Sequence, residues 1–160
     1  MTDTGKRFNR DWIFRHFNYT FTAGSKYAIT GHNGSGKSTL LQVIAGALTV
    51  SEGSVNYVKE NTQIPDDTAF HHISLCAPYL EVIEEMTATE FLNFHFQFKA
   101  PYQSTPVKDI LDRVQLGATA QKQIRYFSSG MKQRIKLAQA FFSDTAVVLF
   151  DEPCTNLDKK

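Results

Sequence analysis

The first thirty residues alternate apolar and polar side chains as a half-buried β-strand does. Phe17, Tyr19 and Phe21 are each separated by one polar residue, which gives a period of two. A turn over residues 23–25 separates this run from a second one over residues 26–30. The pattern therefore predicts β structure up to residue 30, with a glycine-rich segment directly after it.

Four later segments extend this into an alternation of helices and strands. Residues 37–48 are apolar nearly all round, as expected for a helix packed beneath a sheet. Residues 54–58 and 73–76 read as short strands, and residues 61–67 as a loop between them. The run 146–150 is continuously apolar, which is typical of a strand buried on both faces in a parallel sheet. The fold class predicted is α/β, a mostly parallel sheet flanked by helices with an N-terminal antiparallel β segment.

The middle of the chain has a helical pattern instead. Residues 87–90 resemble a capping box, the sequence signature of a helix start. The positions i, i+3, i+4 and i+7 of the following helix are Phe91, Phe94, His95 and Phe98. This aromatic stripe fits the core of a small helical subdomain, the interpretation that we favour, or a face that docks a partner.

Two further helices are predicted after this one, over residues 107–116, ended by Gly117, and over residues 131–143. The residues of the latter that we expect to face inward are Ile135, Leu137, Ala138, Ala140 and Phe141. The chain thus reads as a single domain with a core of residues 1–77 and 131–160. A helical subdomain of about 78–130 is inserted into this core.

Composition excludes several classes of protein. A chain of 160 residues, with 42% hydrophobic and 21% charged residues, has the size and character of one globular domain. It has no apolar run near the roughly 18 residues that span a bilayer. A net charge of +1 argues against a nucleic-acid surface over the whole domain. Cys76 and Cys154 have no C-x-x-C spacing, so we expect free thiols in a reducing cytosol.

The chemistry of the chain begins at residues 31–39, GHNGSGKST, which match G-x-x-x-x-G-K-[ST] in full. Small residues let successive backbone N–H groups point at a polyphosphate at a helix N-terminus. Lys37 reaches the terminal phosphates, and the Ser38 hydroxyl ligates magnesium. The nucleotide-binding residues predicted here are Asn33, Gly34, Ser35, Gly36, Lys37, Ser38 and Thr39. The expected ligands are a nucleoside triphosphate and Mg²⁺.

A second group of candidates follows the apolar run 146–150. Ligands of open α/β sheets bind at the carboxyl ends of the strands, where Asp151 and Glu152 stand. Asp151 is the expected metal-holding residue, and Glu152 the general base that polarises the attacking water. A merely solvated acidic pair is the alternative, which the phosphate loop in the same chain disfavours.

Three segments resemble the nucleotide-binding subunit of ATP-binding-cassette (ABC) transporters, and the resemblance covers nearly the whole chain. Residues 127–134, FSSGMKQR, are similar to the family signature L-S-G-G-Q-x-Q-R, and their Ser128 lies 23 residues ahead of Asp151. Residues 155–158 resemble the D-loop with Asp158. Phe8 stands where the family places an aromatic ring that stacks on adenine; Trp12 and Phe14 are alternatives.

The resemblance implies a P-loop NTPase fold and an ATPase coupled to transport. It implies that two copies pair head to tail around ATP, and that hydrolysis separates them. The signature residues that would act on the other copy's ATP are Ser128, Ser129, Gly130 and Met131. A helix start with basic residues behind it is itself suited to an anion. A transmembrane permease is the implied partner, and the implied location is the cytoplasmic face of the membrane.

The chain departs from the family at three places. Pro78 stands where the family carries a glutamine, and Ser129 and Met131 replace a glycine and a glutamine of the signature. The chain also ends at Lys160, where the family continues, so we expect an incomplete domain that binds nucleotide and hydrolyses it weakly. Because of Pro78, a soluble ABC-type ATPase for assembly, repair or translation is the second hypothesis. A small-molecule kinase is the third, but it leaves the helix start at residue 128 unexplained.

Overall fold

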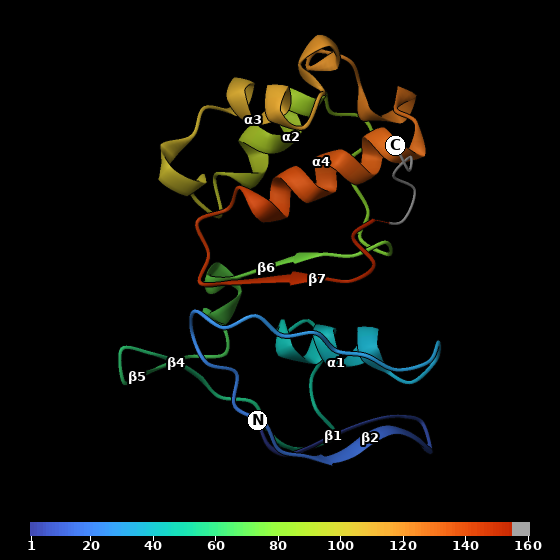
Figure 1. Ribbon diagram of the computed structural model, residues 1–160, viewed down its shortest axis with the longest axis vertical. Helices are drawn as coiled ribbons and strands as arrows, with labels where there is room; N and C mark the ends of the chain where they lie inside the picture. The colour runs from blue at the N-terminus through green and yellow to red at the C-terminus, as the bar shows by residue number, and fades with distance from the viewer. Residues whose placement is uncertain (155–160) are drawn as a thin grey trace. The chain divides into compact units, whose positions relative to one another are not determined.

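The structure is a computed structural model that describes residues 1–154. It divides the chain into two compact units, Met1–Phe70 and His71–Lys160 (Figure 1). The first unit carries the antiparallel strands and one helix. The second carries a parallel strand pair and three helices.

The first unit is built on a β-hairpin. Strands β1 (Thr2–Phe8) and β2 (Asp11–Phe17) pair antiparallel, and β3 (Glu52–Ser54) pairs with the other edge of β1. The Thr4 side chain is fully buried and its hydroxyl donates to the Ser54 carbonyl at 3.0 Å. The Arg15 guanidinium donates two bonds to the Glu52 carboxylate, at 2.8 and 2.9 Å, and links the outer strands. The predicted antiparallel β segment is confirmed.

Two elements complete this unit. Helix α1 (Lys37–Ile44) buries Leu41, Val43 and Ile44. Strands β4 (Tyr57–Lys59) and β5 (Thr62–Ile64) form a second hairpin, and the Tyr57 hydroxyl fixes its first strand to α1 by donating to the Ile44 carbonyl at 3.0 Å.

The strand predictions in this unit are partly wrong. Residues 18–30 lie within the described part of the chain and form no strand there. Tyr19 exchanges two backbone hydrogen bonds with Met1, but the ladder does not continue beyond this pair. Tyr19, Phe21 and Tyr27 instead pack on one another, with ring centroids 4.7–5.8 Å apart. The predicted strand 54–58 is interrupted after Ser54, and the predicted loop 61–67 contains β5.

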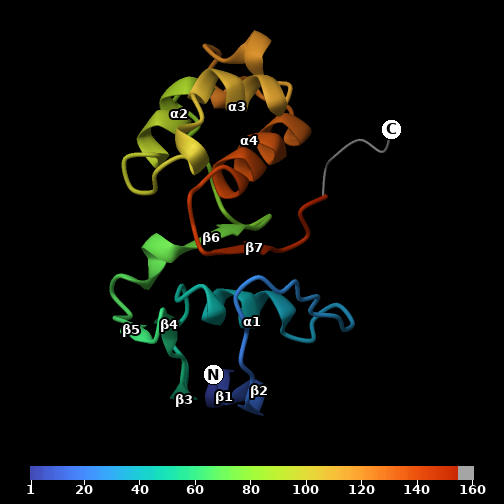
Figure 2. The same cartoon turned by 60° about the vertical axis from the view of Figure 1, so that its left-hand side comes forward.

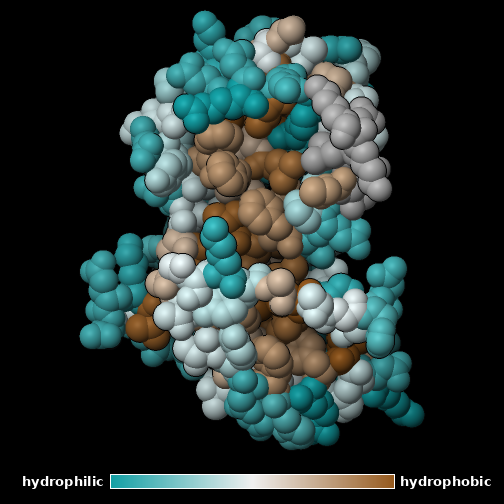
Figure 3. All heavy atoms as spheres, in the orientation of Figure 1, coloured by the Kyte–Doolittle hydropathy of each residue, from teal (hydrophilic) through white to brown (hydrophobic). Residues whose placement is uncertain are grey.

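The second unit contains the strands predicted at 73–76 and 146–150. Strands β6 (Ile73–Cys76) and β7 (Val147–Phe150) pair parallel, with Ile73 opposite Val147 and Cys76 opposite Phe150. Among residues 1–154, β7 pairs with no other strand. Val147 and Phe150 are 41% and 38% exposed, so the prediction that this strand is buried on both faces is wrong. Figure 3 shows apolar residues at the surface over β7 and α4.

Three helices form the core of this unit, α2 (Ala88–His95), α3 (Val107–Arg113) and α4 (Ser129–Phe141) (Figure 2). Their shared buried cluster is Ala88, Phe91, Leu92, Ile110, Leu111, Leu116, Ile124, Phe127, Ile135 and Ala138. The short 3₁₀ turns are η1 (Ala69–His72), η2 (Tyr102–Ser104), η3 (Gly117–Thr119) and η4 (Ile124–Tyr126). The capping box predicted at Thr87 and Glu90 is confirmed, with bonds in both directions.

The inward faces predicted for α2 and α4 need correction. Phe91 is buried, but Phe94 and Phe98 are 40% and 53% exposed and pack edge to face on each other. In α4, the predicted inward positions Ile135, Ala138 and Ala140 are buried and Leu137 is half-buried. Phe141 is 64% exposed because α4 meets the helical core through Ile135 and Ala138 instead, so its inward assignment is wrong.

A polar network holds the far end of α4. The Ser143 hydroxyl donates to the Gln139 carbonyl at 2.7 Å, so it accepts from His95 Nε2 at 2.8 Å. The Gln139 amide donates to His95 Nδ1 at 3.1 Å, which requires a neutral imidazole. Burial, and then the nearby Lys99 ammonium, lower the pKa of His95 to about 4.

Within residues 1–154, no helix combines the length and the apolar character that crossing a bilayer requires.

Candidate nucleotide-binding site

The glycine-rich loop ahead of α1 follows a path on which a side chain at Gly36 would collide with a neighbouring residue. Gly36 is the N-cap residue of α1 with φ at 90°, in the left-handed region. A Cβ at this position would lie 2.4 Å from Ile13 Cγ2. Gly34 also has a positive φ, 81°. The chain therefore needs glycine at both positions to enter the helix by this tight path.

The start of α1 is left open to a ligand. Within the described part of the chain, no side chain caps this helix. The N–H groups of a first helical turn have no partner inside the helix, and the helix dipole favours an anion at that end. Ser38 and Thr39 lie in this turn, and Asn33 and Ser35 are exposed on the loop before it. The backbone here fits the predicted phosphate cradle.

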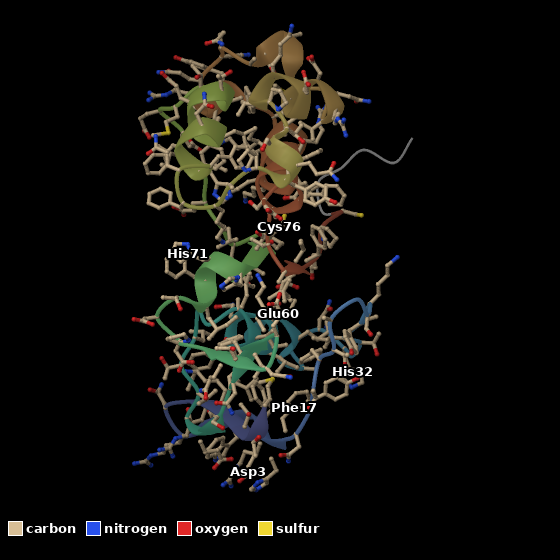
Figure 4. All side chains as sticks on the ribbon, turned by 90° about the vertical axis from the view of Figure 1, so that its left-hand side faces the viewer. Asp3, Phe17, His32, Glu60, His71 and Cys76 are labelled. Atoms are coloured by element: carbon tan, nitrogen blue, oxygen red, sulfur yellow. The ribbon has the colours of Figure 1, made fainter. Side chains whose placement is uncertain are left out.

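Lys37 lies across the loop. Its ammonium donates to the Gly31 carbonyl at 2.9 Å and to the His32 carbonyl at 2.8 Å; His32 is labelled in Figure 4. An ammonium has three N–H donors, so one remains for a phosphate oxygen. The loop carbonyls thus hold the positive charge beside the helix start.

The three aromatic candidates for adenine stacking differ in their surroundings. Phe8 ends β1, is 46% exposed and has the Lys6 ammonium 5.1 Å from its ring centroid. Trp12 is 36% exposed and has the guanidinium groups of Arg7 and Arg15 at 5.4 and 4.2 Å. Phe14 is half-buried and packs on Phe17. Phe8 is the most exposed of the three.

The acidic pair directly follows β7 in the second unit. Asp151 is 7% exposed, and its backbone N–H donates to the Cys76 carbonyl at 2.8 Å. Glu152 is exposed and has φ at 44°, which costs a non-glycine residue roughly 1–3 kcal/mol. Strained backbone of this kind is common at functional sites.

The signature-like segment forms the start of α4. The Ser128 hydroxyl caps the helix by accepting from the Met131 N–H at 3.3 Å, which confirms the predicted helix start. Met131, the residue in place of the family's glutamine, packs partly buried against the helical core. Ser129 and Gly130 form the first turn.

A cleft of about 490 Å³ lies beside α4 in the second unit. Its lining residues are Pro78, Tyr79, Leu80, Glu81, Val82, Glu84, Lys132 and Lys136. Lys136 donates to the Pro78 carbonyl at 3.0 Å, and Lys132 forms an ion pair with Glu84. Lys132 and Lys136 lie one helical turn apart on α4 and thus bind the two ends of the segment 78–84.

The predicted site residues therefore lie in two groups. Phe8 and residues 33–39 belong to the first unit, and Ser128, Ser129, Gly130, Met131, Asp151 and Glu152 to the second. Their convergence on one triphosphate stays a prediction. Asp158 lies outside the described residues.

Gln133 was missed by the sequence analysis. It is only 3% exposed and its amide donates to the Pro153 carbonyl at 2.9 Å. The signal available was its match to the second glutamine of the signature L-S-G-G-Q-x-Q-R.

Comparisons with known proteins identify the family of this chain. The family model described as ABC transporter matches residues 14–155. An uncharacterized ABC transporter ATP-binding protein of Bacillus subtilis, YybJ, is 30% identical over 156 residues, which are 97% of this chain and 71% of that protein. The cytochrome c biogenesis ATP-binding export protein CcmA of Aliivibrio fischeri is 30% identical over 148 residues, 92% of this chain and 72% of that one.

Solved structures show the same fold. The ATP-binding subunit of an ABC transporter superposes with a TM-score of 0.82 at 22% identity, over 98% of this chain and 67% of its own. A bacterial Atm1-family ABC exporter with ATP bound gives 0.80 at 18% identity, over 99% of this chain and 30% of its own. The chain has the α/β fold of the P-loop NTPases and belongs to the ABC transporter family.

Proposed function

We propose that this chain binds and hydrolyses ATP as the nucleotide-binding subunit of an ABC transporter, at the cytoplasmic face of a membrane. The observation that carries the proposal is the loop before α1, with its glycine backbone, uncapped helix start and anchored Lys37. The family match and the names of YybJ and CcmA as ATP-binding proteins support it.

The phosphates of ATP are bound by the backbone N–H groups of residues 33–39 and by the Lys37 ammonium, and adenine stacks on Phe8. The Ser38 hydroxyl and the Asp151 carboxylate would hold Mg²⁺, because oxygen ligands of this kind are the ones that it prefers. When bound, Mg²⁺ neutralises charge on the phosphates.

Glu152 is the general base of the proposed reaction. It takes a proton from water as the water oxygen bonds to the γ-phosphorus, and the bond from this phosphorus to the bridging oxygen breaks. The products are ADP and inorganic phosphate. Because Glu152 is exposed and directly follows β7, its carboxylate is accessible to water.

The signature acts in trans in this proposal. Ser128, Ser129, Gly130 and Met131 of one copy cover the ATP of a second copy, with Asp158 at the same interface. The dimer forms with ATP and separates after hydrolysis, and a transmembrane permease uses this cycle.

One observation favours a second candidate, a soluble ABC-type ATPase. Pro78 offers no side-chain amide, and Lys136 holds its carbonyl against α4. A segment fixed in this way is suited to a clamp that works without a membrane subunit.

Sedimentation of the Glu152→Gln variant, with and without Mg²⁺-ATP, tests the ATP-dependent clamp. We expect monomers without nucleotide and dimers with it, because ATP that is not hydrolysed keeps the clamp closed. The Lys37→Ala, Glu152→Gln double variant is the control and stays monomeric. Dimers that form equally without ATP, or no nucleotide binding by the parent chain, would refute the proposal.

A further inference from the structure

Gln133 is a buried polar side chain with a specific partner. It belongs to α4, is 3% exposed, and its Nε2 donates to the Pro153 carbonyl at 2.9 Å. The same nitrogen lies 4.0 Å from the Cys76 sulfur at the end of β6; Cys76 is labelled in Figure 4. The position of this amide is therefore defined by two elements at once.

The turn that Gln133 contacts carries both predicted catalytic carboxylates. At its start, the Asp151 N–H donates to the Cys76 carbonyl at 2.8 Å. At its end, the Pro153 carbonyl accepts from Gln133. Glu152 lies between these two bonds with a φ of 44°, a conformation that non-glycine residues adopt only when the surroundings hold them there.

The structure assigns to Gln133 the role of a positioning residue, which holds the turn 151–153 on α4 and so directs the Glu152 carboxylate. This inference rests on the proposed function, in which Glu152 activates water. It also links two parts of the proposed site, because α4 begins at Ser129, four residues before Gln133.

The role depends on the amide donor of Gln133. Gln133→Met keeps the length of the side chain and removes the N–H donor. The matched control is Gln139→Met on the same helix, which also loses a side-chain hydrogen bond, the one to His95. If loss of a polar contact of α4 were all that mattered, both variants would behave alike.

ATP hydrolysis by the whole chain is the first measurement. We expect Gln133→Met to lower kcat about 100-fold, the loss that a misplacement of about 1 Å causes. Its affinity for a fluorescent ATP analogue changes less than about twofold, while Gln139→Met keeps the parent kcat. A kcat within about twofold of the parent for Gln133→Met, or an equal loss in both variants, overturns the inference. A parent chain whose activity does not depend on Lys37 contradicts the proposed function instead.

Thiol labelling gives a readout that does not need turnover. In a Cys154→Ser background, the buried Cys76 thiol is the remaining cysteine. We expect Gln133→Met to raise its labelling rate at least about tenfold over Gln139→Met, because the freed turn uncovers the end of β6. Equal labelling rates in the two variants would overturn the positioning role, whether or not the chain hydrolyses ATP.

Discussion

Helices α1 and α4 both begin at segments predicted to face phosphate, but their first turns are built differently. Helix α1 starts from Gly36 in a left-handed conformation, and no described side chain caps it. Helix α4 starts from Ser128, whose hydroxyl accepts from the Met131 N–H. The first turn of α1 is therefore left for a ligand, whereas α4 satisfies part of its own. We infer that α1 gains more stability from nucleotide than α4 does.

The largest expected effect comes from closing the path into α1. Gly36→Ala puts a Cβ 2.4 Å from Ile13 Cγ2 at a φ of 90°. Left-handed backbone and forced repacking together cost about 3–4 kcal/mol. Thermal unfolding and binding of an ATP analogue should show a less stable chain that no longer binds.

Gly24→Ala is the control for this variant. Gly24 has a φ of 76°, but a Cβ there would meet nothing within 4 Å. Gly24→Ala should lower the free energy of unfolding only by the backbone strain, about 1–2 kcal/mol, and should leave nucleotide binding unchanged. Equal losses in both variants would mean that the contact with Ile13 does not matter.

The hydrogen-bond network at the C-terminal end of α4 should make the stability of the chain depend on pH. The pKa of His95 is about 4 in the folded chain, below its ordinary value of 6.5. From pH 6.5 down to 4 the unfolded chain therefore takes up a proton that the folded chain does not. The contribution of His95 to the free energy of unfolding is therefore fully present above pH 6.5. It falls by about 3 kcal/mol towards pH 4.

The measurement is urea unfolding at several pH values, for the parent and for His95→Gln. Other groups titrate in both proteins, so the difference between them isolates His95. A constant difference between pH 7 and pH 4 would contradict the network of His95, Gln139 and Ser143.

The cap of α4 should contribute a smaller amount. Ser128→Ala removes the acceptor of the Met131 N–H, and such a cap contributes about 1 kcal/mol. Urea unfolding should show this loss without nucleotide.

Ser38→Ala, in the first turn of α1, should leave stability without nucleotide nearly unchanged and weaken the dependence of ATP binding on Mg²⁺. If Ser38→Ala lost more stability than Ser128→Ala without nucleotide, α1 and not α4 would be the helix that depends on its own first turn.

The smallest effect is expected at the ion pair of Lys132 and Glu84, which are 29% and 49% exposed. Exposed pairs contribute about 0.2–1 kcal/mol. Glu84→Gln should therefore change the unfolding midpoint slightly, and 1 M salt should remove the difference. A difference that persists in salt would show that this contact is more than a surface pair.

The elements that the sequence predicts well are those with a local cause. The capping box at Thr87 needs only residues within one helical turn, and the strand pair of residues 73–76 and 147–150 follows from two apolar runs. The wrong predictions depend on distant partners. Residues 18–30 have a strand pattern, but among the described residues their pairing stops at Tyr19 with Met1. Phe141 is exposed because α4 meets the helical core through Ile135 and Ala138 instead.

The sequence by itself determined the family and the start of α4, and it carries the predictions made for the phosphate loop and the acidic pair. In each of them the chemistry lies in a few adjacent residues, so spacing alone identifies it. Only the tertiary structure decided that Lys37 lies across its own loop, that Glu152 has a strained backbone and that Gln133 contacts the turn after β7. The Gln133 contact joins residues distant in the chain, and the other two facts depend on the local path of the backbone. No periodicity encodes either.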